Sequence, residues 1–246
     1  MPTRRFKVTI AYKGAAYHGF QRQINAVGIQ NILEDKLSVL TDKRVEIEGC
    51  SRTDKGVSAN MFVFSFSADC RITCDGIVRG MNSALPMDIA VLDCEEAEDD
   101  FHARYSCKGK EYRYFILNTP CRNPFLYETS FHYPKEINLD LMNRAAEYFV
   151  GTHDFTSFCG TSNLKENPVR TVWECHGERT GDMICFTVSG DGFLYNMVRI
   201  MVGTLLWVNE GRFSPEDMPR ILEEKDRRSA GKTAPACGLF LNKVMY

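Results

Sequence analysis

The chain has 246 residues, of which 44% are hydrophobic and 25% charged, and its formal net charge is −2. These values are ordinary for a globular protein and allow one large domain or two modest ones. No apolar run reaches the ~20 residues of a membrane-spanning helix, and no apolar signal core follows the basic N-terminus, so we expect a cytoplasmic protein outside the membrane.

A net charge of −2 argues at first against a nucleic-acid partner. However, six acids crowd into residues 93–100, and without them the basic residues outnumber the acidic ones. Residues 108–122 contain four basic residues and one acidic residue. Because phosphate attraction depends on local potential and not on total charge, the composition is compatible with RNA binding.

The ten cysteines do not follow a metal-binding or disulfide spacing. The closest pair, Cys70 and Cys74, is separated by three residues, and no CxxC motif occurs. We therefore expect reduced thiols, no metal site and a reducing compartment.

The first half of the chain alternates strand and helix patterns. Ile29, Leu33 and Leu37 lie on one helical face, and Phe62, Phe64 and Phe66 lie on one side of a strand. The predicted elements, in order, are a strand over 4–12, a helix over 29–40, strands over 45–50 and 60–68, a helix over 75–84 and a strand over 88–94.

The second half repeats this pattern after the acidic run. Its predicted elements are a strand over 111–117, a helix over 140–150, a hairpin of 172–175 and 183–188, helices over 194–209 and 215–224, and a strand over 239–245. The pattern indicates an α+β protein. We place the domain boundary after residue 104, giving halves of 1–104 and 105–246.

Three groups of residues are candidates for chemistry. The loop 49–60 gathers Arg52, Asp54 and Lys55 between two strands, where catalytic groups are often found. Its Ser, Asp and Gly residues are also ordinary turn formers, and spacing alone favours a solvated turn.

The other two candidates are a lone arginine and a pair of tyrosines. Arg199 is the only charged residue between Asp191 and Glu210, so it is either a cation for a nearby anion or a side chain that reaches solvent. Tyr112 and Tyr114 share one side of a strand, as a stacking surface for bases or, more commonly, as core residues. No catalytic triad order, phosphate-binding glycine loop or metal-ligand cluster accompanies them.

Several motifs in register resemble the TruA family of tRNA pseudouridine synthases, nearly end to end. They are Tyr17-His18-Gly19-Phe20-Gln21; the loop Gly49-x-Ser51-Arg52-Thr53-Asp54-x-Gly56-Val57-x-Ala59; Asn82-x-x-Leu85-Pro86-x-Asp88-Ile89; Asp100-Phe101-His102-Ala103-Arg104; Tyr112-Arg113-Tyr114; Gly151-x-His153-Asp154-Phe155-Thr156-Ser157-Phe158; Met197-Val198-Arg199-x-x-Val202-Gly203; and Gly238-Leu239.

The resemblance implies two ferredoxin-like halves whose sheets join at a central RNA-binding cleft. It implies that Asp54 is the catalytic carboxylate, that Tyr112 stacks on the target uracil, that Arg52 helps to extrude the base, and that Arg199 pairs with the aspartate. The expected activity is isomerisation of uridine to pseudouridine at tRNA positions 38–40, by a homodimer that needs no metal or cofactor. Asp54 would act as a nucleophile on C1′ or as a base on C2′, and the sequence leaves both open.

The chain departs from the commonest family pattern at two positions near Asp54. Lys55 stands where most bacterial members have alanine, and Ser58 where they have histidine. We expect these residues to narrow the set of uridines that reach the carboxylate, or else to point into solvent without effect.

Two other functions are compatible with this fold. One is a non-catalytic RNA-binding protein, which would be expected to lack the aspartate or its arginine partner. The other is a synthase that acts on a different structured RNA.

Overall fold

A computed structural model describes residues 3–160 and 167–246, and the chain forms two compact units. Unit 1 comprises Met1–Lys108 and Phe240–Tyr246, and unit 2 comprises Gly109–Leu239. The division thus follows Lys108, not residue 104, and the end of the chain leaves the C-terminal half in which the sequence placed it. The reason is strand pairing, since Phe240 and Leu241 lie beside Ser58 and Ala59 in a parallel register.

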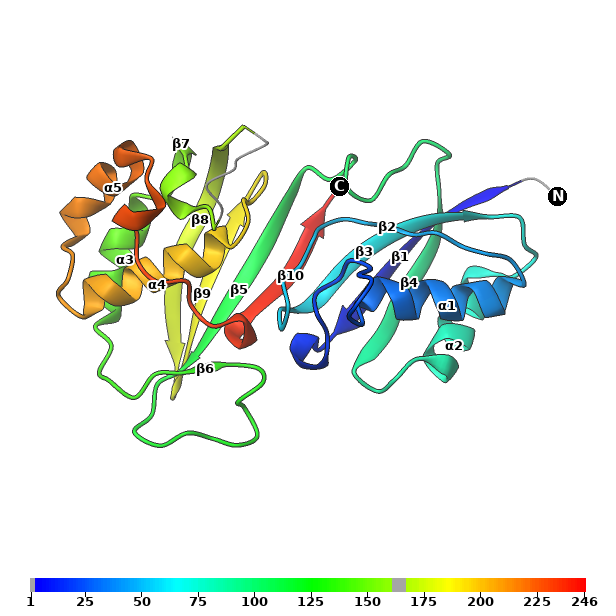
Figure 1. Ribbon diagram of the computed structural model, residues 1–246, viewed down its shortest axis with the longest axis horizontal. Coiled ribbons are helices and arrows are strands. Elements are labelled where there is room, and N and C mark those ends of the chain that lie inside the picture. Colours follow the sequence, from blue (N-terminus) through cyan, green and yellow to red (C-terminus); the bar gives the residue numbers. More distant parts are fainter. Residues whose placement is uncertain (1–2, 161–166) are drawn as a thin grey trace. The chain divides into compact units, whose positions relative to one another are not determined.

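Unit 1 is built on a sheet in the order β4-β1-β3-β10, with β2 paired to β3 (Figure 1). β1 is antiparallel to both of its neighbours. Its elements are β1 (Arg4–Tyr12), η1 (Gly14–Ala16), α1 (Ile29–Thr41), β2 (Glu48–Gly49), β3 (Ser58–Ala68), α2 (Cys74–Ala84), β4 (Ile89–Ala97) and β10 (Leu239–Met245).

Alternation along the strands creates the core of unit 1. Phe6, Val8 and Ile10 are fully buried on β1 and lie opposite a row of phenylalanines on β3. The rings of Phe6 and Phe66 stack with centroids 5.0 Å apart. The apolar faces of α1 and α2 supply the remaining buried side chains, as the helical spacing predicted.

The acidic run is mostly part of β4 and is not a linker. β4 extends to Ala97 and places Glu95 opposite Lys7 and Glu96 opposite Phe6 of β1. Lys7 Nζ lies 2.7 Å from Glu95, and Arg4 forms an ion pair with Glu96. These exposed pairs add little stability, but they neutralise much of the local negative charge.

The strand predicted over 45–50 is wrong in length, because only Glu48–Gly49 pairs as β2. Val45 and Ile47 are still buried. Their backbone N–H groups donate to Ser38 Oγ and Glu34 Oε1 of α1, at 2.9 and 3.1 Å. Side-chain acceptors from a helix therefore take the place of a strand ladder.

Unit 2 has an antiparallel sheet in the order β5-β9-β8-β7, with β6 parallel to β5. Its elements are β5 (Gly109–Leu117), β6 (Phe131–His132), α3 (Leu139–Glu147), β7 (Gly151–Asp154), η2 (Thr156–Phe158), β8 (Val169–Thr180), β9 (Met183–Gly190), α4 (Met197–Asn209), η3 (Pro215–Asp217), α5 (Met218–Glu224), η4 (Arg227–Ser229) and η5 (Ala236–Gly238).

Two helix boundaries of unit 2 differ from the sequence prediction. α3 ends at Glu147, and the residues that follow it form β7, which was not predicted. α4 begins at Met197 and not at residue 194, because Asn196 has a left-handed backbone with φ 62°. A residue in that conformation cannot continue a right-handed helix.

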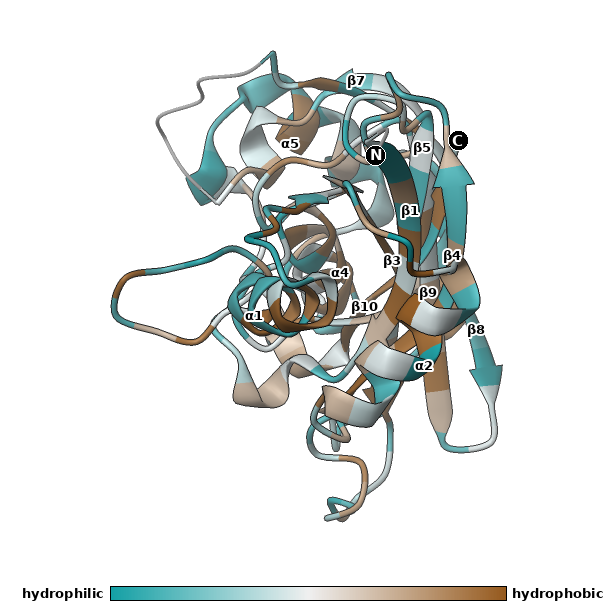
Figure 2. Cartoon of the chain, turned by 90° about the vertical axis from the view of Figure 1, so that its right-hand side faces the viewer, coloured by the Kyte–Doolittle hydropathy of each residue, from teal (hydrophilic) through white to brown (hydrophobic). Residues whose placement is uncertain are grey.

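Helix α4 is buried on nearly all sides and is largely brown in the hydropathy view of Figure 2. The segment 230–235 runs along it with no intervening side chain. A Cβ built on Gly203 would lie only 1.6 Å from the carbonyl oxygen of Lys232, and Gly231 N donates to Thr204 Oγ1 at 2.9 Å. Glycine at 203 is therefore required by the close approach of two backbones.

We expect Gly203→Ala to destabilise the protein by more than the ~1–3 kcal/mol typical of overpacking, because a backbone oxygen must move. Thermal denaturation followed by circular dichroism measures this effect. Gly80→Ala on α2 is the matched control, since its Cβ would meet only the flexible end of Leu40. Equal melting temperatures for the two variants would contradict the close approach.

Candidate active site

The loop 51–57 joins β2 to β3 and carries Arg52 and Asp54. Arg52 is exposed, whereas Asp54 is half-buried. Thr53, between them, is buried, and its hydroxyl is hydrogen-bonded to that of Tyr12 at 2.8 Å. The loop is thus anchored in the core by the residue that separates the two charged side chains.

Backbone hydrogen bonds hold the loop on both sides of Asp54. Phe20 N donates to Thr53 O at 3.2 Å, and Val57 N donates to Asp54 O at 3.1 Å. Gly56 N donates to Tyr17 O at 3.3 Å. Because the carbonyls on either side of its Cα are occupied, Asp54 begins a turn whose backbone is held in place.

The segment 17–20 forms the support for this loop. Gly19 has φ +89°, and a Cβ on it would lie 2.4 Å from Thr53 O. The hydroxyl of Tyr17 donates to Asp88 Oδ1 at 2.6 Å, and burial, reinforced by this carboxylate, raises the pKa of the Tyr17 phenol. The motifs that contain Tyr17 and Asp88 therefore support the motif that contains Asp54.

The two unusual residues near Asp54 have different environments. Lys55 is exposed in a turn, which is compatible with both expectations stated for it. Ser58 is fully buried at the start of β3, and its Oγ accepts a hydrogen bond from Gly14 N at 3.0 Å. The expectation that Ser58 points into solvent is therefore wrong.

In unit 2, β5 presents both tyrosines on the buried side. Tyr112 is 7% exposed, and its ring meets the edge of Phe193 at 5.1 Å. Tyr114 is fully buried and donates to Pro235 O at 2.7 Å, and burial raises the pKa of its phenol. Tyr114 is thus a core residue, while Tyr112 stands at the margin of the core.

Arg199 lies in the first turn of α4 and is half-buried. Its Nε donates to Ala234 O at 2.8 Å, and its Nη1 donates to Asn196 Oδ1 at 2.7 Å. Ala234 N in turn donates to Arg199 O at 3.0 Å. Two neutral oxygens, one from the backbone and one from a side chain, therefore hold the guanidinium at Nε and Nη1.

The four predicted site residues fall two in each unit: Arg52 and Asp54 in unit 1, Tyr112 and Arg199 in unit 2. The residues that support them were not singled out from the sequence. Asp88 and Gly203 lie inside the recognised motifs, but nothing in their spacing indicates what they contact. Phe193 and Asn196 are close to α4 in sequence, yet only the fold shows their contacts.

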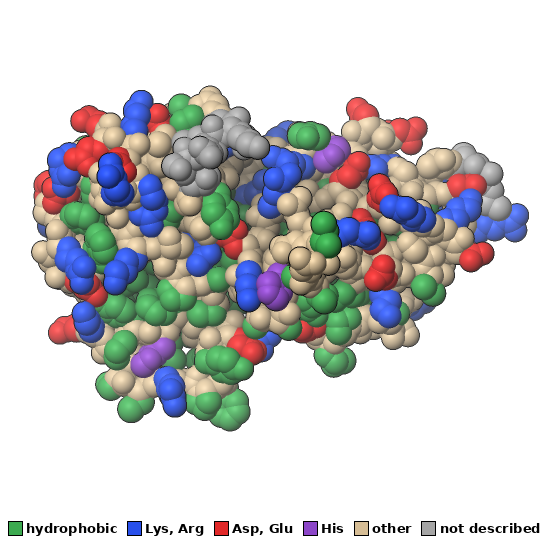
Figure 3. All heavy atoms as spheres, in the orientation of Figure 1, with side chains coloured by type: hydrophobic (Ala, Val, Ile, Leu, Met, Phe, Trp, Pro, Cys, Tyr) green, Lys and Arg blue, Asp and Glu red, His purple; other side chains and the backbone are tan. Residues whose placement is uncertain are grey.

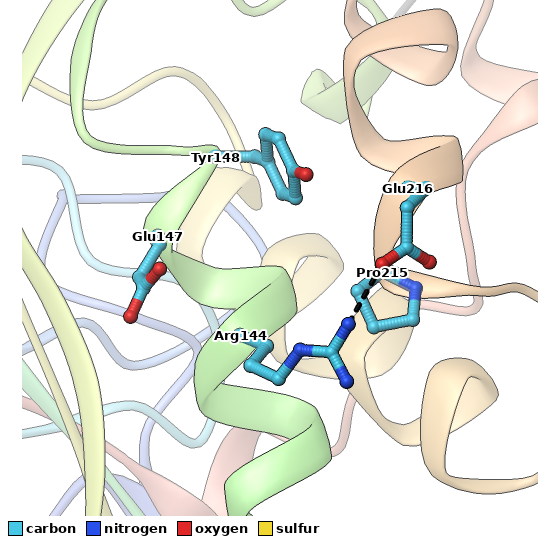
Figure 4. A pocket seen from close by; sticks show the side chains of 5 residues that line it. All are labelled: Arg144, Glu147, Tyr148, Pro215 and Glu216. Atoms are coloured by element: carbon cyan, nitrogen blue, oxygen red, sulfur yellow. Dashed lines mark hydrogen bonds and ion pairs between the residues drawn. The ribbon is translucent and has the colours of Figure 1, made fainter.

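The described residues contain no group of three or more metal-binding side chains and no helix long and apolar enough to cross a membrane. All ten cysteines are free thiols, as predicted. A pocket of about 330 Å³ lies beside α3 and η3, where Arg144 forms an ion pair with Glu216 at 2.8 Å (Figure 4). None of the four predicted site residues lines it.

Comparison with known proteins shows the family to which the chain belongs. The chain matches the family described as tRNA pseudouridine synthase over residues 8–106 and 145–246. A tRNA pseudouridine synthase A of Acetivibrio thermocellus is 42% identical over 243 residues, covering 99% of this chain and 100% of that protein. The corresponding protein of Exiguobacterium sibiricum is 44% identical, covering 99% and 97%. The chain therefore belongs to the tRNA pseudouridine synthase family.

Proposed function

We propose that this protein isomerises uridine to pseudouridine in the anticodon stem-loop of tRNA, at positions 38–40, with Asp54 as the catalytic carboxylate. Membership of the family supports the reaction class. The observation that carries the residue assignment is the bracing of the Asp54 loop, whose flanking carbonyls accept the N–H groups of Phe20 and Val57. A carboxylate on fixed backbone is suited to attack at one atom of a bound nucleotide.

The reaction rearranges bonds without net oxidation or hydrolysis. The bond between C1′ and N1 breaks, the uracil turns, C1′ bonds to C5, and the proton on C5 is transferred to N1 through a base or water. An ionised Asp54 either attacks C1′ or removes a proton from C2′. Both routes require the deprotonated carboxylate, which a neighbouring cation favours.

The other residues have supporting roles in this proposal. The target base must leave the stacked stem-loop before it can react. Exposed Arg52 is suited to assist that extrusion, Tyr112 to stack on the uracil, and Arg199 to pair with Asp54. The polypeptide side chains present suffice for this chemistry, so the proposal includes no metal or cofactor.

Substrate binding is expected to depend on local charge. Figure 3 shows lysine and arginine side chains distributed among acidic ones, and no single-sign face is evident in that view. Contacts to phosphate should therefore come from individual basic side chains placed near the site. The proposal also includes a homodimer and a cytoplasmic location.

We expect Asp54→Asn to bind tRNA and to form no pseudouridine, because asparagine keeps the shape but cannot act as a nucleophile or base. Tritium release from tRNA labelled at C5 of uridine measures the reaction, and filter binding measures affinity. Asp35→Asn, an exposed change on α1 with the same loss of charge, is the control. Activity of Asp54→Asn within about tenfold of wild type would remove Asp54 from its role.

We expect Arg199→Met to shift the pH–activity profile to higher pH. Loss of the guanidinium raises the pKa of a paired carboxyl, so the active, deprotonated Asp54 is reached only at higher pH. Single-turnover rates across the pH range measure this shift. Arg113→Met on β5 is the control, because Arg113 is exposed and paired with Glu111. An unchanged profile with normal activity would contradict the pairing.

We expect Lys55→Ala to broaden the set of modified positions, because an exposed lysine beside Asp54 can hold one phosphate by a charge-assisted hydrogen bond. Transcripts with a single uridine at each candidate position, assayed with both proteins, give the relative rates. Lys36→Ala on α1 controls for the lost charge. Equal relative rates for the wild type and Lys55→Ala would show that Lys55 does not select among the uridines.

A further inference from the structure

We propose that Asn196 is a positioning residue that sets the orientation of the Arg199 guanidinium. The inference rests on the function proposed above for Arg199. It concerns a different residue, which acts on the reaction only through that arginine.

Two contacts on adjacent edges define the plane of the guanidinium. Nη1 donates to Asn196 Oδ1 at 2.7 Å, and Nε donates to Ala234 O at 2.8 Å. The acceptor at Ala234 is itself fixed, since Ala234 N donates back to Arg199 O at 3.0 Å. A planar group held at two of its nitrogens has little freedom to rotate, and Asn196 supplies one of these two contacts.

Asn196 is not used as an ordinary helix cap. Asparagine at this position usually accepts a hydrogen bond from a backbone N–H of the first turn. Here the Asn196 side chain makes no such bond, and its oxygen instead accepts from Arg199. The Asn196 side chain thus makes no capping hydrogen bond to the helix backbone. It is instead hydrogen-bonded to the guanidinium of Arg199, three residues later.

The backbone around Asn196 is arranged to hold this contact. Asn196 adopts φ 62°, a conformation that asparagine tolerates better than most residues. Gly160 N donates to Tyr195 O at 2.8 Å, and a Cβ on Gly160 would lie 2.7 Å from Asn196 Nδ2. Gly160 therefore leaves the room that the amide nitrogen of Asn196 occupies, while the amide oxygen accepts from Arg199.

The proposed role requires a neutral hydrogen-bond acceptor at position 196. An aspartate would offer the same geometry but would compensate the charge of Arg199. An amide oxygen orients the guanidinium and leaves its full positive charge to act on an anion, which in the proposed function is the Asp54 carboxylate.

The test compares Asn196→Gly with Asn196→Ala. Glycine accepts the left-handed backbone and removes only the side chain, whereas alanine removes the side chain and adds backbone strain. We expect both variants to lose kcat for tRNA by roughly 10- to 100-fold, the size of a lost hydrogen bond to a charged group, with KM changed by less than about twofold. Only Asn196→Ala should lower the melting temperature.

Asp42→Gly is the control, because Asp42 is also a left-handed residue at a helix end, with φ 53°, and it has no role in the proposed site. It should leave kcat unchanged. Wild-type kcat in Asn196→Gly would overturn the proposal, and loss of kcat in the alanine variant alone would assign Asn196 a purely backbone role. Failure of the proposed function has a different signature: no pseudouridine formed by the wild type, or full activity of Asp54→Asn.

Discussion

Backbone packed directly against glycine holds the proposed catalytic residues of both units. In unit 1, Gly19 lets the chain approach the carbonyl of Thr53, which precedes Asp54. In unit 2, Gly203 lets the carbonyl of Lys232 reach α4, one turn beyond Arg199. Neither approach leaves room for a methyl group. The backbone near Asp54 and the backbone near Arg199 are therefore each in direct contact with another backbone segment. This limits the motion of the two side chains more than side-chain packing alone would.

Several motif residues form part of this support. The hydroxyl of Tyr17 donates to Asp88 Oδ1 at 2.6 Å, and the side-chain amide of Asn82 donates to Val91 O and accepts from Val91 N, both at 2.8 Å. The second contact fixes α2 on β4 and so fixes the position of Asp88. Many positions characteristic of the family thus keep one short loop in place, which explains why a small reactive group needs a long pattern around it.

Arg199 shows how a charge is kept in an apolar helix. A half-buried cation without hydrogen bonds would be costly, and an acidic neighbour in its own unit would cancel the charge. The structure provides neutral oxygens from Ala234 and Asn196 to two of the guanidinium nitrogens. Of the two alternatives that the sequence left open, a side chain that simply reaches solvent does not fit these contacts, and a role as a cation for an anion stays a prediction.

The sequence by itself determined the α+β class and the order of most elements, and it led to the prediction of the four site residues. Period-two and helical patterns record which side of each element is buried, and the motifs carry the resemblance to the family. Only the tertiary structure decided that Val45 and Ile47 bond to a helix, that α4 starts at Met197, and that the last strand returns to unit 1. It also decided that Ser58 is buried and that Asn196 Oδ1 accepts a hydrogen bond from Arg199. These features depend on contacts between residues distant in the chain or on a single backbone angle, and neither leaves a periodic signal in the sequence.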